Sequence, residues 1–420
     1  MRLSLLRFKE FQSSWKERHL SEIVGRLESG VSVNSEDFPA SKDEYGILKT
    51  SCIANGYFFE HENKKIVATE IKRAKLNPSA DSILVSRMNT PQLVGEVGYV
   101  RKSYPHLFVP DRLWLIEVAD KERDSTKWLS QQLTTKRLKN VFSNIASGTS
   151  GSMKNIAQPN FLKIEISTPD FEEQTKIANF LTAVDEKISQ LKQKCELLTQ
   201  YKKGVMQQIF SQELRFKPAL SEVEGDEDGR VFAEWENAVL GGVAKLRNGY
   251  TFKSETYSPT GQYRVITIAN VQDGYMDIAK CSLVDAIPAD IQIHQQLQEN
   301  DIIISMTGNV GRVCKVKTPN CLLNQRVGKF EPLRITSDFL YFTLNQSRFL
   351  TEMELIAQGG AQKNIGVKDI EGYEITLPCV EEQIKIANFL TAIDEKITTT
   401  QTQLQAVKQY KQGLFQQMFV

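Results

Sequence analysis

The chain has 420 residues, a hydrophobic fraction of 41% and a formal net charge of +1 at pH 7. At roughly 150 residues per domain, this length predicts two or three domains. No run approaches the roughly 18 apolar residues of a membrane span, and the stretch LSLL near the start is too short for a signal peptide, so we expect a cytoplasmic protein that does not associate with membranes.

Charged and metal-binding side chains give little sign of a site. The small net charge does not by itself indicate nucleic-acid binding, although the acidic stretch from Ala219 to Trp235 leaves the remainder more basic. We interpret its most acidic part, Glu222 to Asp228, as a surface linker. The six cysteines form no C-x-x-C pair and the four histidines are scattered. We therefore expect free thiols in a reducing compartment and no bound metal.

Residues 1–170 predict an α+β domain. Short β-rich runs such as ILVS, VGYV and LWLIEV alternate with Gly and Asn turns. The string MKNI, from Met153, is followed by a strand pattern that ends in proline just before the next element.

Residues 171–213 predict a long helix that packs against another helix. Its apolar positions follow each other at steps of four and three, which is a heptad pattern. The seam consists of Ile177, Leu181, Val184, Ile188, Leu191 and Leu198. At 1.5 Å per residue, the 39 residues from Glu172 to Phe210 form a rod of roughly 58 Å.

Residues 214–379 predict a second α+β domain that is related to the first. YRVITIANVQDGY, from Tyr263, corresponds to YGILKTSCIANGY, from Tyr45, and DIIISMTGNVGRVCKV corresponds to DSILVSRMNTPQLVGEVGYV. QKNI in this domain corresponds to MKNI in the first. A helix is expected over SDFLYFTLNQSRFLTEMEL, from Ser337.

Residues 380–420 predict a second long helix that repeats the first. EEQIKIANFLTAIDEKI stands 209 positions after EEQTKIANFLTAVDEKI, and more than half of the positions from Glu172 to Phe210 are identical in the copy. The seam is repeated as Ile386, Leu390, Ile393, Ile397, Leu404 and Val407.

The two long helices are expected to pair in antiparallel orientation. Parallel pairing in register would set Lys202 opposite Lys411, where like charges repel. Antiparallel pairing instead sets each lysine against an apolar position such as Ile393 or Val184. The alternative is that each helix packs separately on its own domain.

The sequence carries none of the common catalytic signatures. It has neither G-x-x-x-x-G-K-[ST] nor G-x-G-x-x-G, no H-E-x-x-H and no Asn- or Asp-Pro-Pro-aromatic string. The acids of PDFEEQTK, from Pro169, suit the positive end of a helix dipole, and the copy PCVEEQIK loses the aspartate. We expect no catalytic residues.

Two related but diverged domains joined by a rigid helix pair suit a DNA duplex. Half-sites on one face of a duplex lie about 34 to 36 Å apart, and antiparallel helices give the domains an approximate two-fold relation, as the strands of a duplex have. Candidate contacts to bases and phosphates lie in turn-rich loops. In the first domain they are Lys49, Thr50, Arg87, Asn89, Thr90, Arg112, Lys154 and Asn155, and in the second Thr267, Asn270, Thr307, Asn309, Arg312, Gln325, Arg326, Lys363 and Asn364. The alternative for each is a solvated loop residue.

The layout resembles the DNA-specificity subunit of type I restriction-modification systems. The resemblance covers essentially the whole chain and is carried by LRFKEF with the following Trp15, the DIIISMTGNVGRV loop, the KNI strings and the two EEQ-KIANFLTA-DEKI helices. It implies two tandem target-recognition domains, separated and joined by two long antiparallel coiled-coil helices. Each domain would read one half of a bipartite, asymmetric DNA sequence.

The resemblance also implies partners and cofactors. The subunit would bind double-stranded DNA and two modification (methyltransferase) subunits, together with restriction or translocase subunits. S-adenosylmethionine, ATP and Mg would belong to those partners, so no cofactor is expected in this chain. The helix surfaces are also expected to dock these partners through aromatic residues outside the seam, and the alternative for each is that it packs on its own domain. These residues are Phe180, Tyr201, Phe389, Tyr410 and Phe415.

Two other classes of function compete with this interpretation. A coiled-coil adaptor for protein partners would bind random and cognate duplexes equally weakly and with equal salt sensitivity. A self-contained nuclease or methyltransferase would be active as the purified chain.

Overall fold

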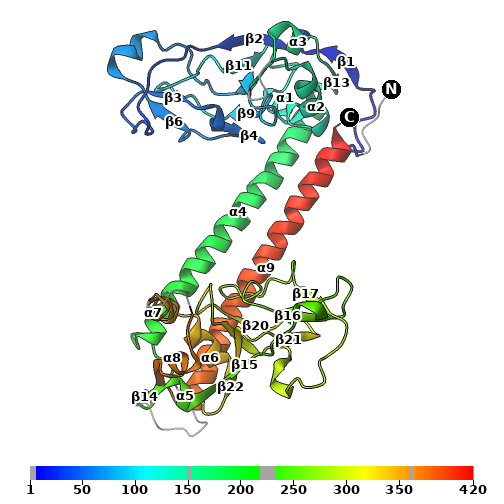
Figure 1. The fold of residues 1–420 in the computed structure, drawn as a ribbon. Coiled ribbons are helices and arrows are strands. Elements are labelled where there is room, and N and C mark those ends of the chain that lie inside the picture. The colour runs from blue at the N-terminus through cyan, green and yellow to red at the C-terminus, as the bar shows by residue number, and fades with distance from the viewer. Residues whose placement is uncertain (1–5, 149–152, 218–231, 359–363, 420) are drawn as a thin grey trace, which may run out of the picture. The chain divides into compact units, whose positions relative to one another are not determined.

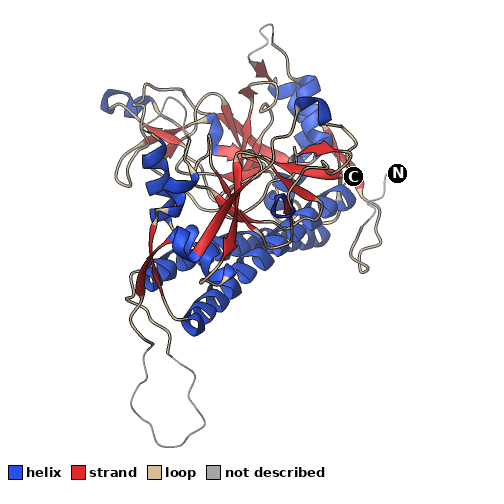
Figure 2. Cartoon of the chain, turned by 60° about the horizontal axis from the view of Figure 1, so that its bottom comes forward, coloured by secondary structure: helices blue, strands red, loops and turns tan. Residues whose placement is uncertain are grey.

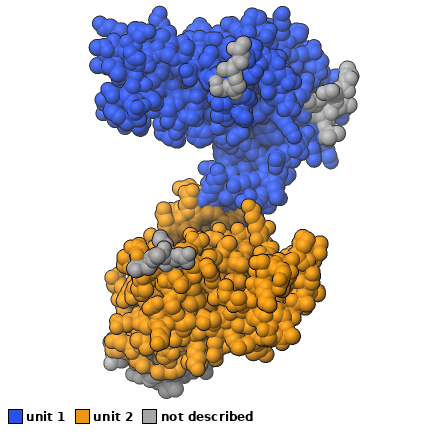
Figure 3. All heavy atoms as spheres, in the orientation of Figure 1, with its two compact units in different colours: residues 1–192, 402–420 blue, residues 193–401 orange. Residues whose placement is uncertain are grey.

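The computed structural model describes residues 6–148, 153–217, 232–358 and 364–419. The chain divides into two compact units (Figure 3). Unit 1 comprises residues 1–192 and 402–420, and unit 2 comprises residues 193–401. Two long helices, α4 (Phe171–Phe210) and α9 (Val380–Met418), each begin in one unit and end in the other.

Unit 1 is an α+β domain built on a six-stranded sheet with the order β2-β11-β7-β9-β5-β4. Its strands are β1 (Lys16–His19), β2 (Val24–Ser29), β3 (Gly46–Leu48), β4 (Ile53–Ala54), β5 (Gly56–Phe58), β6 (Asn63–Lys65), β7 (Ser82–Ser86), β8 (Met88–Asn89), β9 (Val97–Val100), β10 (Leu107–Phe108), β11 (Leu113–Val118), β12 (Lys154–Asn155) and β13 (Glu165–Thr168). A smaller sheet has the order β10-β3-β6, and β1 pairs with β13. The short helices are α1 (Thr126–Leu133), α2 (Lys136–Ile145) and α3 (Gln158–Leu162).

Unit 2 repeats this plan with shorter sheets. Its strands are β14 (Glu236–Val239), β15 (Ala244–Asn248), β16 (Tyr263–Ile266), β17 (Ser282–Val284), β18 (Gln296–Leu297), β19 (Ile302–Ser305), β20 (Val313–Lys315), β21 (Cys321–Leu323), β22 (Val327–Pro332) and β23 (Glu374–Leu377). The sheet orders are β15-β22-β19-β20 and β17-β16-β21-β18, and β14 pairs with β23. Its helices are α5 (Leu240–Val243), α6 (Ser337–Leu344), α7 (Ser347–Ala357) and α8 (Val367–Glu371). Helices and strands are mixed throughout (Figure 2), which confirms the predicted α+β class.

The two long helices lie side by side and antiparallel in each unit (Figure 1). In unit 1 the first half of α4 shares a core with the last half of α9, because Ile177, Leu181 and Leu414 belong to one buried cluster. In unit 2 the last half of α4 shares a core with the first half of α9, through Val205 and Leu390. The predicted antiparallel pairing is therefore confirmed.

The seam positions are buried most completely near the beginning of each long helix. Ile177, Leu181, Ile188 and Leu191 in α4, and Ile386, Leu390 and Ile393 in α9, are at most 9% exposed. Val184, Leu198, Ile397, Leu404 and Val407 are half-buried.

Two details of the predicted long elements differ from the structure. The two seam lysines do not face apolar positions, because Lys411 pairs with Asp185 in unit 1 at 2.6 Å and Lys202 pairs with Asp394 in unit 2 at 2.7 Å. The helix expected from Ser337 is split into α6 and α7. The split arises where the Asn345 side chain turns back to the Tyr341 carbonyl, 2.7 Å away, and the next residue is extended.

The aromatic residues expected to dock partners also fall into two groups. Phe180, Phe389 and Phe415 pack on aromatic rings of their own units. Tyr201 and Tyr410 remain 53% and 55% exposed, whereas the three phenylalanines are half-buried.

The start of each long helix is fixed by the same buried ion pair. In unit 1, Arg7 donates two hydrogen bonds to the Glu173 carboxylate, at 2.9 and 2.6 Å, and the Trp15 indole donates a third at 3.1 Å. In unit 2, Arg215 and Trp235 bind Glu382 in the same way, at 2.7, 2.9 and 3.1 Å. The hydrogen bond to the carboxylate raises the pKa of each arginine. Because both glutamates are fully buried, these contacts anchor the segment before each domain to its helix.

Candidate nucleic-acid interface

Six of the candidate residues in unit 1 meet where β8 pairs with β12. The register sets Asn89 opposite Lys154 and Met88 opposite Asn155. The backbone N–H of Arg87 donates to the Arg112 carbonyl at 3.1 Å. We call this group the unit 1 cluster: Arg87, Asn89, Thr90, Arg112, Lys154 and Asn155. It unites residues from three segments of the chain.

The unit 1 cluster presents hydrogen-bond donors on an aromatic support. The Arg87 guanidinium lies 5.6 Å from the centroid of the buried Trp114 ring, and its Nε donates to the Asn155 side-chain oxygen at 3.4 Å. An arginine stacked on a ring is held in a fixed plane and keeps its remaining donors free. Arg112 is exposed and has no side-chain partner within the described ranges. These two arginines can bind phosphate oxygens or guanine edges.

Other members of the unit 1 cluster shape the backbone. The Asn89 side chain is only 9% exposed. Its amide donates to the Ser86 hydroxyl at 3.2 Å and its oxygen accepts the Thr90 N–H at 2.8 Å. The Lys154 ammonium donates to the Gly148 carbonyl at 3.3 Å. Asn89 therefore stabilises the turn that follows β7, and Lys154 holds the neighbouring loop.

Unit 2 repeats the backbone hydrogen bonds of the unit 1 cluster but carries different side chains. We call these shared backbone hydrogen bonds the backbone frame. The Met306 N–H donates to the Arg326 carbonyl, and the Ile365 N–H donates to the Met306 carbonyl, both at 3.0 Å. The corresponding bonds in unit 1 use Arg87, Arg112 and Ile156. Arg326 therefore corresponds to Arg112, and Met306 stands where unit 1 has Arg87.

We call Thr307, Asn309, Arg326 and Asn364 the unit 2 cluster. The Thr307 hydroxyl donates to the Asn364 side-chain oxygen at 2.9 Å, while Asn309 and Arg326 are exposed. Gln325 is exposed next to Arg326 and accepts a hydrogen bond from Thr251 at 2.7 Å. This surface is richer in neutral polar groups than the unit 1 cluster.

The remaining candidates lie in other turns. Lys49 precedes the short helix Thr50–Cys52 and forms an ion pair with Glu62 at 2.7 Å. Arg312 donates to the Gln272 side chain at 2.6 Å. Lys363 lies outside the described residues.

Asn270 has its hydrogen-bonding capacity used within its own turn. Its side-chain oxygen accepts from the N–H and the hydroxyl of Thr267, each at 2.9 Å, and its amide donates to the Asp277 carbonyl at 2.8 Å. The side chain is 4% exposed. Asn270 and Thr267 therefore form the turn after β16.

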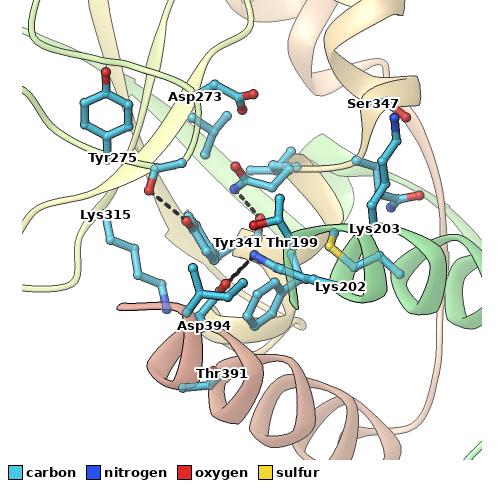
Figure 4. Close-up of a pocket in the computed structure, with 18 of the residues that line it drawn as sticks. Thr199, Lys202, Lys203, Asp273, Tyr275, Lys315, Tyr341, Ser347, Thr391 and Asp394 are labelled. Atoms are coloured by element: carbon cyan, nitrogen blue, oxygen red, sulfur yellow. Dashed lines mark hydrogen bonds and ion pairs between the residues drawn. The ribbon is translucent and has the colours of Figure 1, made fainter. Parts of the chain in front are cut away.

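Sequence reasoning missed the aromatic support and the cavity beside the helices. Trp114 lies in a strand pattern, and its period gives no sign that the arginine just after the neighbouring strand β7 stacks on its ring. In unit 2, a cavity of about 1550 Å³ lies where α4 and α9 meet the loops of the domain (Figure 4). The Lys202–Asp394 pair lies in its wall, together with Tyr275, Lys315 and Tyr341.

The described parts of the chain hold no arrangement suited to a metal ion. Residues 6–148, 153–217, 232–358 and 364–419 contain no group of three or more His, Cys, Asp or Glu side chains that could hold one. Within those same ranges, none of the helices combines the length and apolar character that a membrane crossing requires.

Comparison with known families accounts for the duplicated plan. The model of the type I restriction modification DNA specificity domain matches residues 12–200 and 233–409. The chain belongs to this family. The two matched ranges contain both clusters and both long helices up to their last turns.

Named relatives agree with the family over most of the chain. A putative type I restriction enzyme MjaX specificity subunit from Methanocaldococcus jannaschii is 23% identical, and the alignment covers 96% of this chain and 92% of the relative. The EcoAI specificity subunit of Escherichia coli is 30% identical over 189 residues, covering 42% of this chain and 31% of the relative.

A solved structure shares the fold over the full length. The type I restriction-modification S subunit from M. genitalium superposes with a TM-score of 0.62 at 16% identity, covering 100% of this chain and 99% of that one.

Proposed function

We propose that this chain is the DNA specificity subunit of a type I restriction-modification complex and that each unit reads one half of a bipartite, asymmetric DNA sequence. The observation that carries the proposal is the repeated backbone frame with unlike side chains. Arg112 and Arg326 occupy matching positions, whereas Arg87 is matched by Met306. Because the backbone frame is the same in both units, the two units dock on DNA in the same way. Because their side chains at matching positions differ, the two units prefer different bases.

The long helices set the distance between the two half-sites. The two ion pairs support this role, because Lys202 lies 17 residues after Asp185 and Lys411 lies 17 residues after Asp394. One antiparallel register therefore satisfies both pairs. A helix pair fixed in register cannot slide, which makes its length a spacer.

The helices also bind two modification subunits. Tyr201 and Tyr410 support this role, since they are 209 positions apart in the repeat and both are exposed. Equivalent tyrosines on duplicated helices suit two copies of one partner, and tyrosine is enriched at protein interfaces.

Restriction or translocase subunits complete the complex. S-adenosylmethionine, ATP and Mg bind to those partners, and the complex works in the cytoplasm.

The proposal is tested by removing the matched arginines one at a time. The chain and its Arg112→Ala and Arg326→Ala variants are each expressed with a modification subunit, and the methylated motif is determined by sequencing. A lost base contact costs about 1–3 kcal/mol of discrimination, so each variant relaxes one half of the motif and leaves the other intact. Arg334→Ala is the matched control, because its ion pair with Glu236 is exposed.

Two results contradict the proposal. One is a wild-type motif that is a single continuous sequence. The other is relaxation of the same half-site by both arginine variants, because it would mean that the two units do not read separate halves.

A further inference from the structure

The tip of the β4–β5 hairpin touches the helix pair in unit 1. The Tyr57 hydroxyl donates to Asp185 in α4 at 2.5 Å and accepts from the Lys411 ammonium in α9 at 3.2 Å. Lys411 also lies 5.2 Å from the centroid of the Tyr57 ring. Burial and the neighbouring carboxylate raise the pKa of Tyr57, so the hydroxyl keeps the proton that it donates. One side chain therefore contacts both helices.

Two of the candidate DNA contacts immediately precede this hairpin in the chain. Lys49 and Thr50 stand at the short helix that leads directly into β4, and β4 pairs with β5 so that Ala54 lies opposite Tyr57. Few residues separate Lys49 from the Tyr57 contact. The Tyr57 contact therefore lies close in the chain to these two candidate residues.

A second contact holds the tip against the domain. The Asn55 N–H donates to the Glu96 carboxylate at 2.7 Å, and the Lys139 ammonium binds both Glu96, at 2.5 Å, and the Asn55 side chain, at 3.2 Å. Asn55 and Gly56 have positive φ angles of 52° and 87°, which form the tight turn. The tip thus lies between the domain and the helices, bonded to both.

Unit 2 has the ion pair but lacks the tyrosine contact. Tyr275 follows Gly274 as Tyr57 follows Gly56, yet it is 61% exposed, and its side chain has no partner in the described part of unit 2. Its hydroxyl points away from Lys202 and Asp394 (Figure 4). The loop is held instead through its backbone, because the Tyr341 hydroxyl donates to the Gly274 carbonyl at 3.2 Å.

We propose that Tyr57 is a positioning residue that ties the DNA-reading hairpin of unit 1 to the helix pair, and that unit 2 reads its half-site without such a tie. The inference rests on the proposed function. It adds an asymmetry between the two readers that the duplicated sequence does not suggest. The helix pair orients Lys49 and Thr50 through Tyr57, whereas the corresponding loop of unit 2 is oriented by its own domain alone.

Tyr57→Phe and Tyr275→Phe form a matched pair of variants. Each removes one hydroxyl from equivalent positions, and Tyr57→Phe leaves both residues of the Asp185–Lys411 pair unchanged. Each full-length variant is assembled with modification subunits, and binding is measured on the cognate duplex and on duplexes with either half-site altered. The half-site of unit 1 is the one relaxed by Arg112→Ala.

The expected result is about tenfold weaker cognate binding by Tyr57→Phe, equivalent to about 1.4 kcal/mol, with discrimination lost only at the half-site of unit 1. Tyr275→Phe binds as the wild type does. Hydrogen exchange gives a second measurement without DNA: residues 53–58 exchange faster in Tyr57→Phe, and residues 271–276 are unchanged in Tyr275→Phe.

Equal behaviour of the two variants, in binding and in exchange, overturns the inference. A loss of discrimination at both half-sites by Tyr57→Phe also overturns it, because it indicates general destabilisation. Failure of the proposed function has a different outcome, namely no preference of the wild-type complex for any duplex.

Discussion

Units 1 and 2 share their supporting contacts and differ in the side chains that they present. Both units bury a glutamate beneath an arginine and a tryptophan, and both join α4 to α9 through an Asp–Lys pair. The stacked pair of Arg87 and Trp114 exists only in unit 1, since the frame of unit 2 has Met306 and Gly328 at those positions. The duplicated chain keeps the contacts that hold each domain to its helices and varies the side chains of the candidate DNA contacts.

The largest expected loss of stability comes from breaking the buried Arg–Glu pair at the start of each long helix. Arg7→Ala and Arg215→Ala each leave a buried carboxylate without its cation, because the side chains of Glu173 and Glu382 are 1% and 0% exposed. Removing one partner of a buried pair costs about 3–5 kcal/mol. We expect the free energy of unfolding to fall by that amount in both variants, as measured by urea denaturation followed by circular dichroism.

The control for the anchor is Arg26→Ala, whose ion pair with Glu28 is solvent-exposed. Its expected change is below about 1 kcal/mol. If the loss at Arg7 were as small as the loss at Arg26, the anchor would not be a shared structural element.

Substitutions at equivalent seam positions should lower the stability of the two units equally. Leu181 and Leu390 are 209 positions apart, and both are fully buried. Replacing either by alanine removes apolar contacts and leaves a cavity, so we expect a loss of about 2–5 kcal/mol in each variant. Thermal unfolding measures it, with Leu197→Ala as the control because Leu197 is 56% exposed. A large loss at only one of the two leucines would contradict the equivalence of the helices.

Substitutions at equivalent positions beside the unit 1 and unit 2 clusters should change DNA binding unequally. Arg87→Met gives unit 1 the residue that unit 2 carries at the same place, and it removes a cation that is stacked on Trp114. We expect cognate binding to weaken by about 1–3 kcal/mol and the slope of log affinity against log salt to fall by about 1. Titration of the assembled complex with duplex at several salt concentrations measures both quantities.

The reciprocal change is the matched control. Met306→Arg introduces a cation at a side chain that is 7% exposed, in a unit that has Gly328 where unit 1 has the Trp114 ring. We expect no gain in affinity from it. Tighter binding by Met306→Arg would mean that the aromatic support is not needed.

The sequence predicted those features that depend on repetition and period. The duplicated string beginning at Glu172 and the seam around Leu181 identified both helices, and the repulsion between Lys202 and Lys411 favoured antiparallel pairing. The Asp partners of these lysines were not predicted, because they lie one position from the seam and only the final register brings them together. The break at Asn345 was missed because a side chain that bonds back to the helix leaves no interruption in the apolar pattern.

The surroundings of the candidate contacts were predicted less completely, for a related reason. Residue type and loop position identified Arg112, Asn155, Arg326 and Asn364, which the structure brings into matching frames. The same rule selected Asn270, whose side chain is occupied within its turn. Neither the ring beneath Arg87 nor the contact of Tyr57 with α4 and α9 could be predicted, because both join residues that are distant in sequence and whose proximity depends on the fold.

The central claim, that a helix pair of fixed register spaces two unlike readers, is tested most directly by lengthening both helices. One heptad is inserted between Lys194 and Cys195 and another between Gln401 and Thr402, which are opposite points in the register of the two ion pairs. An insertion in α4 alone is the control, because it places one ion pair out of register.

The methylated motif of the doubly lengthened chain decides the question. A heptad adds about 10 Å of helix, or about three base pairs of duplex. The account predicts a motif with unchanged half-sites and a gap that is longer by about three base pairs. Altered half-sites with an unchanged gap would contradict it.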